Sequence, residues 1–139
     1  MGFIAPLPGA QKLRYKLTVV PPGKRAFPFH NYRVNDEMFF VIEGAGEVRI
    51  GEAVYPIRSG DVVACTAGGP ETAHQMINTG ALELKYLAIS TMLSPEIAEY
   101  PDSAKFGVLA EYPAAPDCQP RGFRFVGRDT LSLDYWDGE

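Results

Sequence analysis

The chain has 139 residues, a length typical of one domain with a hydrophobic core of its own. Its 13 basic and 17 acidic residues give a net charge of −4 without long runs of one sign, which excludes the basic surfaces that bind nucleic acid or membranes. Hydrophobic residues make up 46% of the chain, as in globular proteins, but no apolar stretch approaches the roughly 20 residues of a membrane span.

The first ten residues predict neither a secretory signal nor a lipid anchor. They lack a basic segment, Pro6 and Pro8 interrupt the apolar run, and Pro6 stands where a myristoylation signal has Ser or Thr. The two cysteines, Cys65 and Cys118, form no disulfide framework and no metal-binding CxxC pair. We therefore expect a reduced, cytoplasmic protein whose two thiols are buried or half-buried.

Alternation of apolar and polar residues with a period of two predicts β-strands along most of the chain. The first strand has apolar residues at every second position from Leu13 to Val19 and stops at a Pro-Pro-Gly turn. Glycine-containing turns separate further apolar segments at 37–43, 47–50, 53–57, 62–65, 72–78 and 82–90. About seven short strands at this spacing are typical of an all-β sandwich or barrel.

The segment after these strands predicts one short helix and an extended arm. Ser94 is a good N-cap, Pro95 suits the first helical position, and Pro101 limits the helix to a turn or two. Prolines then punctuate residues 113–120. The apolar residues that follow are too many for a free tail, so we expect 123–136 to lie on the barrel or on a partner subunit.

The two histidines of the chain, His30 and His74, each stand near other polar residues. Residues two apart on a strand point the same way, so His30 and Tyr32 can converge on one point. Glu37 and His74 must come from neighbouring strands to join them. From spacing alone, two ordinary hydrogen-bonded histidines explain this set as well as metal ligands do.

Two longer patterns surround these residues. Residues 23–44 read Gly-x6-His-x-Tyr-x4-Glu-x6-Gly, and residues 60–78 read Gly-x7-Gly-x5-His-x3-Asn. They resemble the two signatures of the cupin superfamily, Gly-x5-His-x-His-x(3,4)-Glu-x6-Gly and Gly-x5-Pro-x-Gly-x2-His-x3-Asn. The chain departs from them at Tyr32, at Thr66 in place of the proline, and in a three-residue insertion before His74. The resemblance covers residues 23–90 and is to small, single-domain cupins of unassigned activity.

The resemblance implies one all-β domain over residues 1–139, a double-stranded β-helix or jelly-roll barrel. Its barrel core would span about 11–92, with the short helix and the C-terminal arm in 93–139. It also implies a divalent metal in the barrel interior, held in the family by three histidines and one glutamate. Carried over residue by residue, the ligands here are His30, Glu37 and His74.

Tyr32 stands where the family has its second histidine. Three alternatives follow: a tyrosinate ligand, a water in its place, or a metal-free site in which Tyr32 donates to Glu37. The two histidines and the carboxylate match sets that hold non-haem iron or zinc, and nickel and manganese stay open. We expect a bound metal, with Tyr32 in a second layer around it rather than coordinated to it, because a neutral phenol is a poor ligand.

Strand parity suggests the walls of the site. If Glu37 faces inward, so do Phe39 and Val41, and if His74 does, so does Met76; each of these is also explained as ordinary barrel core. Two functions fit the sequence. The first is a metal-dependent enzyme acting on a small organic molecule, as an oxygenase, isomerase, lyase or decarboxylase. The second is a non-catalytic cupin that binds or senses a sugar or an acid with a degenerate or empty metal site.

Two further interpretations concern partners. Lys24 and Arg25, just before His30, are interpreted as solvated loop charges rather than as an anion site. A short barrel leaves sheet edges and apolar outer residues such as Met38, Phe40 and Ile42 that need a cover. We therefore expect a homodimer, with exchange of terminal arms as one way to form it.

Overall fold

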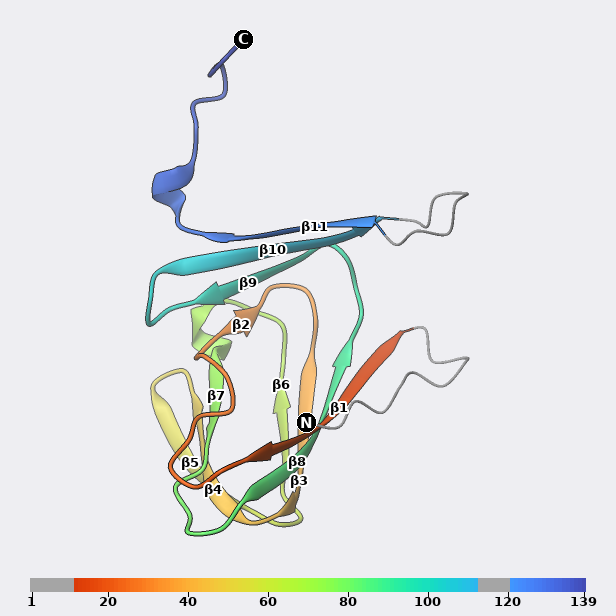
Figure 1. Ribbon diagram of the computed structural model, residues 1–139, viewed down its shortest axis with the longest axis vertical. Helices are drawn as coiled ribbons and strands as arrows, with labels where there is room; N and C mark the ends of the chain where they lie inside the picture. The colour runs from red at the N-terminus through yellow and green to blue at the C-terminus, as the bar shows by residue number, and fades with distance from the viewer. Residues whose placement is uncertain (1–11, 113–120) are drawn as a thin grey trace.

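The computed structural model describes residues 12–112 and 121–139, and almost all regular structure in these ranges is β (Figure 1). Two short 3-10 turns, Pro70–Thr72 and Asp129–Leu131, accompany the strands. The strands are β1 (Leu13–Val20), β2 (Asn31–Tyr32), β3 (Glu37–Glu43), β4 (Ala45–Ile50), β5 (Ala53–Arg58), β6 (Val62–Cys65), β7 (His74–Ile77), β8 (Leu84–Thr91), β9 (Glu96–Tyr100), β10 (Lys105–Tyr112) and β11 (Arg121–Gly127). The expected all-β class is confirmed.

The strands form three antiparallel sheets. One has the order β1-β8-β3-β6, the second β5-β4-β7, and the third β11-β10-β9-β2. Single bridges from Arg25 to Ile77 and from His30 to His74 attach the segment before β2 to the free side of β7. The first two sheets and this segment form the barrel, and β9, β10 and β11 lie across the end that carries β2 (Figure 1).

The hydrophobic core fills the space between the first two sheets. Phe39, Val41, Met76, Leu84 and Tyr86 are at most 2% exposed and belong to one cluster. Two motif glycines shape the turns around this core. Gly44 and Gly60 have φ values of +90° and +93°, and a Cβ on Gly44 would collide with the Glu83 carbonyl oxygen, so this turn requires glycine.

The first strand turns its polar side inward, which the sequence pattern did not indicate. Thr18 and Val20 are buried, whereas Val19 is 38% exposed. The register explains this orientation, because Thr18 pairs with Tyr86, whose side chain is in the core. The alternation therefore identified the two faces of β1 but not the face that is covered.

The predicted short helix after residue 94 is wrong, because residues 96–100 form β9. Glu96 and Ala98 are buried with the period of a strand, and β9 lies between β10 and β2. Ser94 does not cap a helix; its hydroxyl oxygen accepts a hydrogen bond from the Glu111 backbone N–H at 2.8 Å. Long-range pairing therefore overrides the local helix signal.

The C-terminal arm lies only in part on the rest of the chain. β11 pairs with β10, and the Phe125 ring lies 5.8 Å from that of Phe106. The chain after Asp129–Leu131 leads away from the body (Figure 1), and Leu133, Tyr135 and Trp136 are exposed rather than packed on the barrel. The predictions about residues 1–10, Cys118 and the prolines of 113–120 lie outside the described residues.

Candidate metal centre

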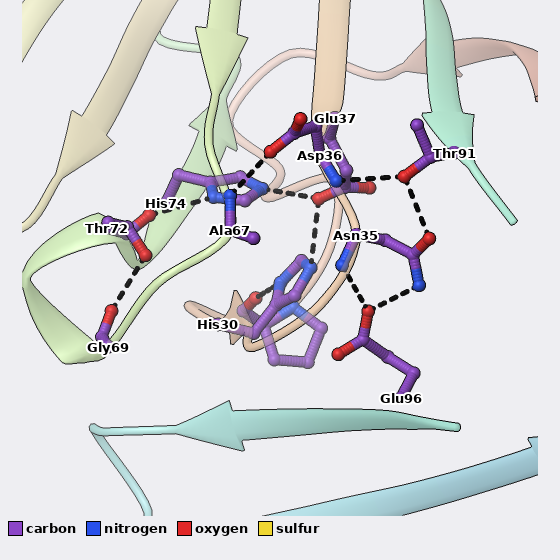
Figure 2. Close-up of polar contacts among 11 residues, drawn as sticks. His30, Asn35, Asp36, Glu37, Ala67, Gly69, Thr72, His74, Thr91 and Glu96 are labelled. Carbon is purple, nitrogen blue, oxygen red and sulfur yellow. Dashed lines mark hydrogen bonds and ion pairs between the residues drawn. The ribbon is translucent and has the colours of Figure 1, made fainter. Parts of the chain in front are cut away.

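Three polar side chains from different parts of the chain converge inside the barrel end covered by β9 (Figure 2). His30 lies just before β2, Glu37 begins β3 and His74 begins β7. The backbone N–H groups of His30 and His74 each donate to the carbonyl of the other, at 3.2 and 2.8 Å. Residues paired in this way project their side chains from the same face, which brings both imidazoles to Glu37.

The ligand atoms of these three residues are close enough to share one ion. Nε2 of His74 lies 2.7 Å and Nε2 of His30 3.5 Å from Oε2 of Glu37. One atom from each residue lies within 4.8 Å of the others. Within residues 12–112 and 121–139, no other group of three His, Cys, Asp or Glu residues has this geometry. The structure therefore brings together the three residues that the sequence predicted as ligands.

Both imidazoles are oriented by carbonyl groups on their far sides. Nδ1–H of His30 donates to the Pro28 carbonyl at 2.7 Å, and Nδ1–H of His74 donates to the Thr72 carbonyl at 3.2 Å. With Nδ1 engaged in this way, both rings turn Nε2 toward the same carboxylate oxygen of Glu37, so two imidazoles and one carboxylate meet at one point. A carbonyl on the second ring nitrogen is the usual partner of a metal-bound histidine, and the donor set fits a divalent metal.

Glu37 is ionised despite its burial. Burial alone would raise the pKa of its carboxyl group, but the hydrogen bonds from His30 and His74 together outweigh that effect and hold the pKa at about 2. Cys65 pairs with Glu37 across β3 and β6 and, unlike Glu37, keeps its proton. Burial, and after it the charge of Glu37, raises the pKa of Cys65 to about 12, so its thiol stays protonated.

Tyr32 lies beside His30, at the position where the cupin signature has a histidine. Its ring centroid is 4.9 Å from that of His30 and nearly perpendicular to it, at 76°. Burial, followed by the charge of Glu37, raises the pKa of Tyr32 well above its usual value. The phenol is therefore neutral in this environment and available as a hydrogen-bond donor.

A pocket of about 280 Å³ opens beside Glu37 and Tyr32. Arg14 and Lys16 of β1 contribute to its wall, together with residues of β8 and of the sheet that covers the barrel end. Phe39, Val41 and Met76 do not border this pocket. They are buried in the core below the ligands, where the Phe39 ring lies 5.6 Å from that of His74.

A hydrogen-bond network holds the loop that leads into Glu37 (Figure 2). The Glu96 carboxylate accepts from the backbone N–H and from the side-chain amide of Asn35, at 2.7 and 2.5 Å. The Asn35 carbonyl oxygen accepts from the Thr91 hydroxyl at 2.8 Å, and Thr91 Oγ1 accepts from the Asp36 N–H at 3.0 Å. Asn35 and Asp36 directly precede Glu37, so β8 and β9 fix the position of the carboxylate.

Comparison with known proteins identifies the family of this chain. The family model described as Cupin domain matches residues 16–90, more than half of the chain. The chain belongs to the cupin family. Among curated proteins, no sequence matches.

Solved structures agree with this assignment. A sugar phosphate isomerase of the cupin superfamily from Silicibacter pomeroyi is 23% identical, with a TM-score of 0.73 over 93% of this chain and 75% of that one. A predicted oxalate decarboxylase from Thermotoga maritima is 26% identical, with a TM-score of 0.53 over 58% and 66%. A Cupin 2 conserved barrel domain protein from Salinispora arenicola, 23% identical, has a TM-score of 0.53 over 63% and 70%. At these identities the likeness concerns the fold.

Sequence reasoning missed two parts of this cupin site. Arg14 and Lys16 were not identified as site residues, and only the pairing of Thr18 with Tyr86 reveals that they face inward. The Asn35–Glu96 contact was missed because it joins residues 61 positions apart.

No helix in the described parts of the chain is long and apolar enough to cross a bilayer.

Proposed function

We propose that this cupin binds one divalent metal ion through His30, Glu37 and His74 and acts on a small organic molecule in the adjoining pocket. The observation that carries the proposal is the orientation of the two imidazoles. Each uses Nδ1 for a backbone carbonyl and turns Nε2 to the same carboxylate oxygen. A single proton would serve only one of the two Nε2 atoms at a time, whereas a divalent ion would serve both.

The metal would supply Lewis-acid or redox chemistry to a ligand in the pocket. Two imidazoles and one carboxylate suit Fe²⁺ and Zn²⁺, and Ni²⁺ and Mn²⁺ accept the same donors. The protein's own contribution begins with the aromatic rings of the half-buried Phe27 and the buried Phe39, which lie 5.9 and 5.6 Å from the His74 ring and would exclude water beneath the ligands.

We assign Tyr32 a role next to the metal rather than on it. Its burial and the negative charge of Glu37 both favour the neutral phenol, which coordinates poorly. The ring packs edge-on against His30 and borders the pocket. Tyr32 would therefore donate a hydrogen bond to the ligand and hold its orientation. Direct tyrosinate coordination is the competing assignment.

Redox-neutral chemistry, isomerase or lyase, is the reaction class we favour over an oxygenase. Its support is the similarity to a sugar phosphate isomerase and to a predicted oxalate decarboxylase. One observation favours the alternative of a binding or sensing protein without turnover. Of the other carboxylates at the pocket, Glu96 is occupied by backbone and Asn35 donors, and Glu111 faces Arg14, so neither is placed as a general base.

Metal titration of Glu37→Gln and of the unchanged protein tests this proposal. Glutamine keeps the size of the side chain and removes the charge, so zinc affinity by calorimetry should fall roughly a hundredfold or more. Glu83→Gln, an exposed residue directly before β8, is the matched control and should bind as the unchanged protein does. Equal affinity of all three proteins would contradict the proposal. Incubating the loaded protein with sugar phosphates and with oxalate then separates turnover from binding.

A further inference from the structure

Two cationic side chains enter the pocket from β1, on the same face as Glu37. Arg14 pairs with Ser90, and Ser90 pairs on its other side with Glu37. In the next row, Lys16 pairs with Ala88, and Ala88 pairs with Phe39. Residues in one such row project from the same face of the sheet, so Arg14 and Lys16 share the inner face with the proposed metal ligand.

The dimensions of this arrangement suit one small ligand. Strands lie about 4.8 Å apart, so the backbones at Arg14 and Glu37, two strands apart, are separated by about 10 Å. Both Arg14 and Lys16 line the same pocket of about 280 Å³ as Tyr32 and Glu37.

The carboxylates that border the pocket leave Arg14 accessible to an anion. Glu96 is committed to Asn35 and to backbone N–H groups. Glu111 faces Arg14 at 3.5 Å, with both side chains more than 60% exposed. Exposed ion pairs of this kind contribute little free energy, whereas an anion held by a guanidinium forms charge-assisted hydrogen bonds. An incoming anion would therefore displace Glu111 from Arg14.

We infer that Arg14 and Lys16 form an anion subsite, so that the ligand of this cupin carries a carboxylate or phosphate group. The group lies against β1, and the remainder of the ligand extends toward His30, Glu37 and His74. This orientation rests on the proposed metal function, whereas the subsite itself does not. The charges that the sequence placed near His30, Lys24 and Arg25, are not part of the pocket wall.

Titration of isotope-labelled, metal-free protein with inorganic phosphate and, separately, with succinate tests the subsite by NMR. We expect saturable binding of at least one anion, with the largest amide shifts in β1 and β8. Arg14→Gln and Lys16→Gln should each weaken binding about tenfold, because each removes a charge-assisted contact. Glu111→Gln should strengthen binding severalfold. The anion that binds with the higher affinity indicates whether the ligand's anionic group is a phosphate or a carboxylate.

The ion pair of Lys85 and Glu43 supplies matched controls on the outer side of the same sheet. Lys85→Gln removes one positive charge, as Arg14→Gln and Lys16→Gln do, and Glu43→Gln removes one negative charge, as Glu111→Gln does. Both control variants should leave anion binding within about twofold of the unchanged protein. No saturable binding of either anion, or equal losses in Lys16→Gln and Lys85→Gln, would overturn the subsite. Zinc binding is measured on the same samples. Zinc without anion binding would refute the subsite alone, and anion without zinc binding would refute the metal function alone.

Discussion

Nε2 of His74 lies 2.7 Å from Oε2 of Glu37, although the two residues are 37 positions apart and begin strands in different sheets. Two separate pairings produce this contact. β3 is fixed between β6 and β8, and His74 is fixed by its reciprocal backbone hydrogen bonds with His30. The site is therefore assembled by the barrel as a whole, which would hold the three proposed ligands in place for an ion.

Tyr32→Phe removes only the hydroxyl group that we place beside the metal. We expect the variant to bind one ion per chain with affinity close to that of the unchanged protein, because our assignment leaves the phenol uncoordinated. Tyr32→His should tighten metal binding, since it offers a third imidazole. The check is the visible spectrum of the iron-loaded protein. A charge-transfer band that disappears in Tyr32→Phe would show direct coordination and refute the assignment.

Glu96→Ala should destabilise the fold, because it leaves buried donors without an acceptor. The carboxylate accepts from the backbone N–H groups of Val34, Asn35 and Ile97 and from the Asn35 amide. We expect a loss of about 2–4 kcal/mol in the free energy of unfolding, measured with urea. Glu83→Ala, an exposed acid, should change it by about 0.5 kcal/mol or less. If Glu96→Ala changed the free energy of unfolding as little as Glu83→Ala, the network would not contribute to the stability of the fold.

How far the sequence predicts this protein depends on the kind of residue. His30, Glu37 and His74 could be singled out because the stretches around them resemble the two cupin signatures, whereas their spacing alone fitted ordinary hydrogen-bonded residues equally well. The inward face of Arg14 and Lys16 was not, because alternation along β1 is the same whichever side is covered. Ser94 and Pro95 gave a genuine local helix signal, and the pairing of β9 with β10 overrode it.

Cys65 provides a test of the barrel interior by pH. Its folded pKa of about 12 lies above the ordinary value, so the thiol stays protonated, and unreactive, until the pH approaches 12. In a Cys118→Ser background, at pH 8, only about one molecule in ten thousand would carry the thiolate. We expect alkylation far slower than in urea-unfolded protein. Alkylation at the unfolded rate would show that the interior is open to solvent.

We propose that the chain forms a homodimer through the outer face of the β1-β8-β3-β6 sheet. Val19, Phe40, Ile42 and Val62 are between 38 and 59% exposed there, and Phe40 pairs directly with Val62. The C-terminal segment, which leads away from its own barrel with Tyr135 and Trp136 exposed, is suited to contact a second copy.

Light scattering at micromolar concentration should give twice the 15.2 kDa mass of the chain. Phe40→Glu should reduce it to one chain without unfolding the protein, because this side chain lies outside the core. Val54→Glu, at an apolar position on β5 that is more exposed than Phe40, should remain dimeric. A single-chain mass for the unchanged protein would contradict the dimer.

The most direct test of the metal centre is a crystal structure of the zinc-loaded protein, with diffraction recorded on both sides of the zinc absorption edge. We predict one strong anomalous peak per chain, about 2.0–2.2 Å from Nε2 of His30, Nε2 of His74 and a carboxylate oxygen of Glu37. Tyr32 Oη should lie beyond bonding distance of the peak. Absence of a peak at these three residues, with zinc bound elsewhere or not at all, would contradict the account.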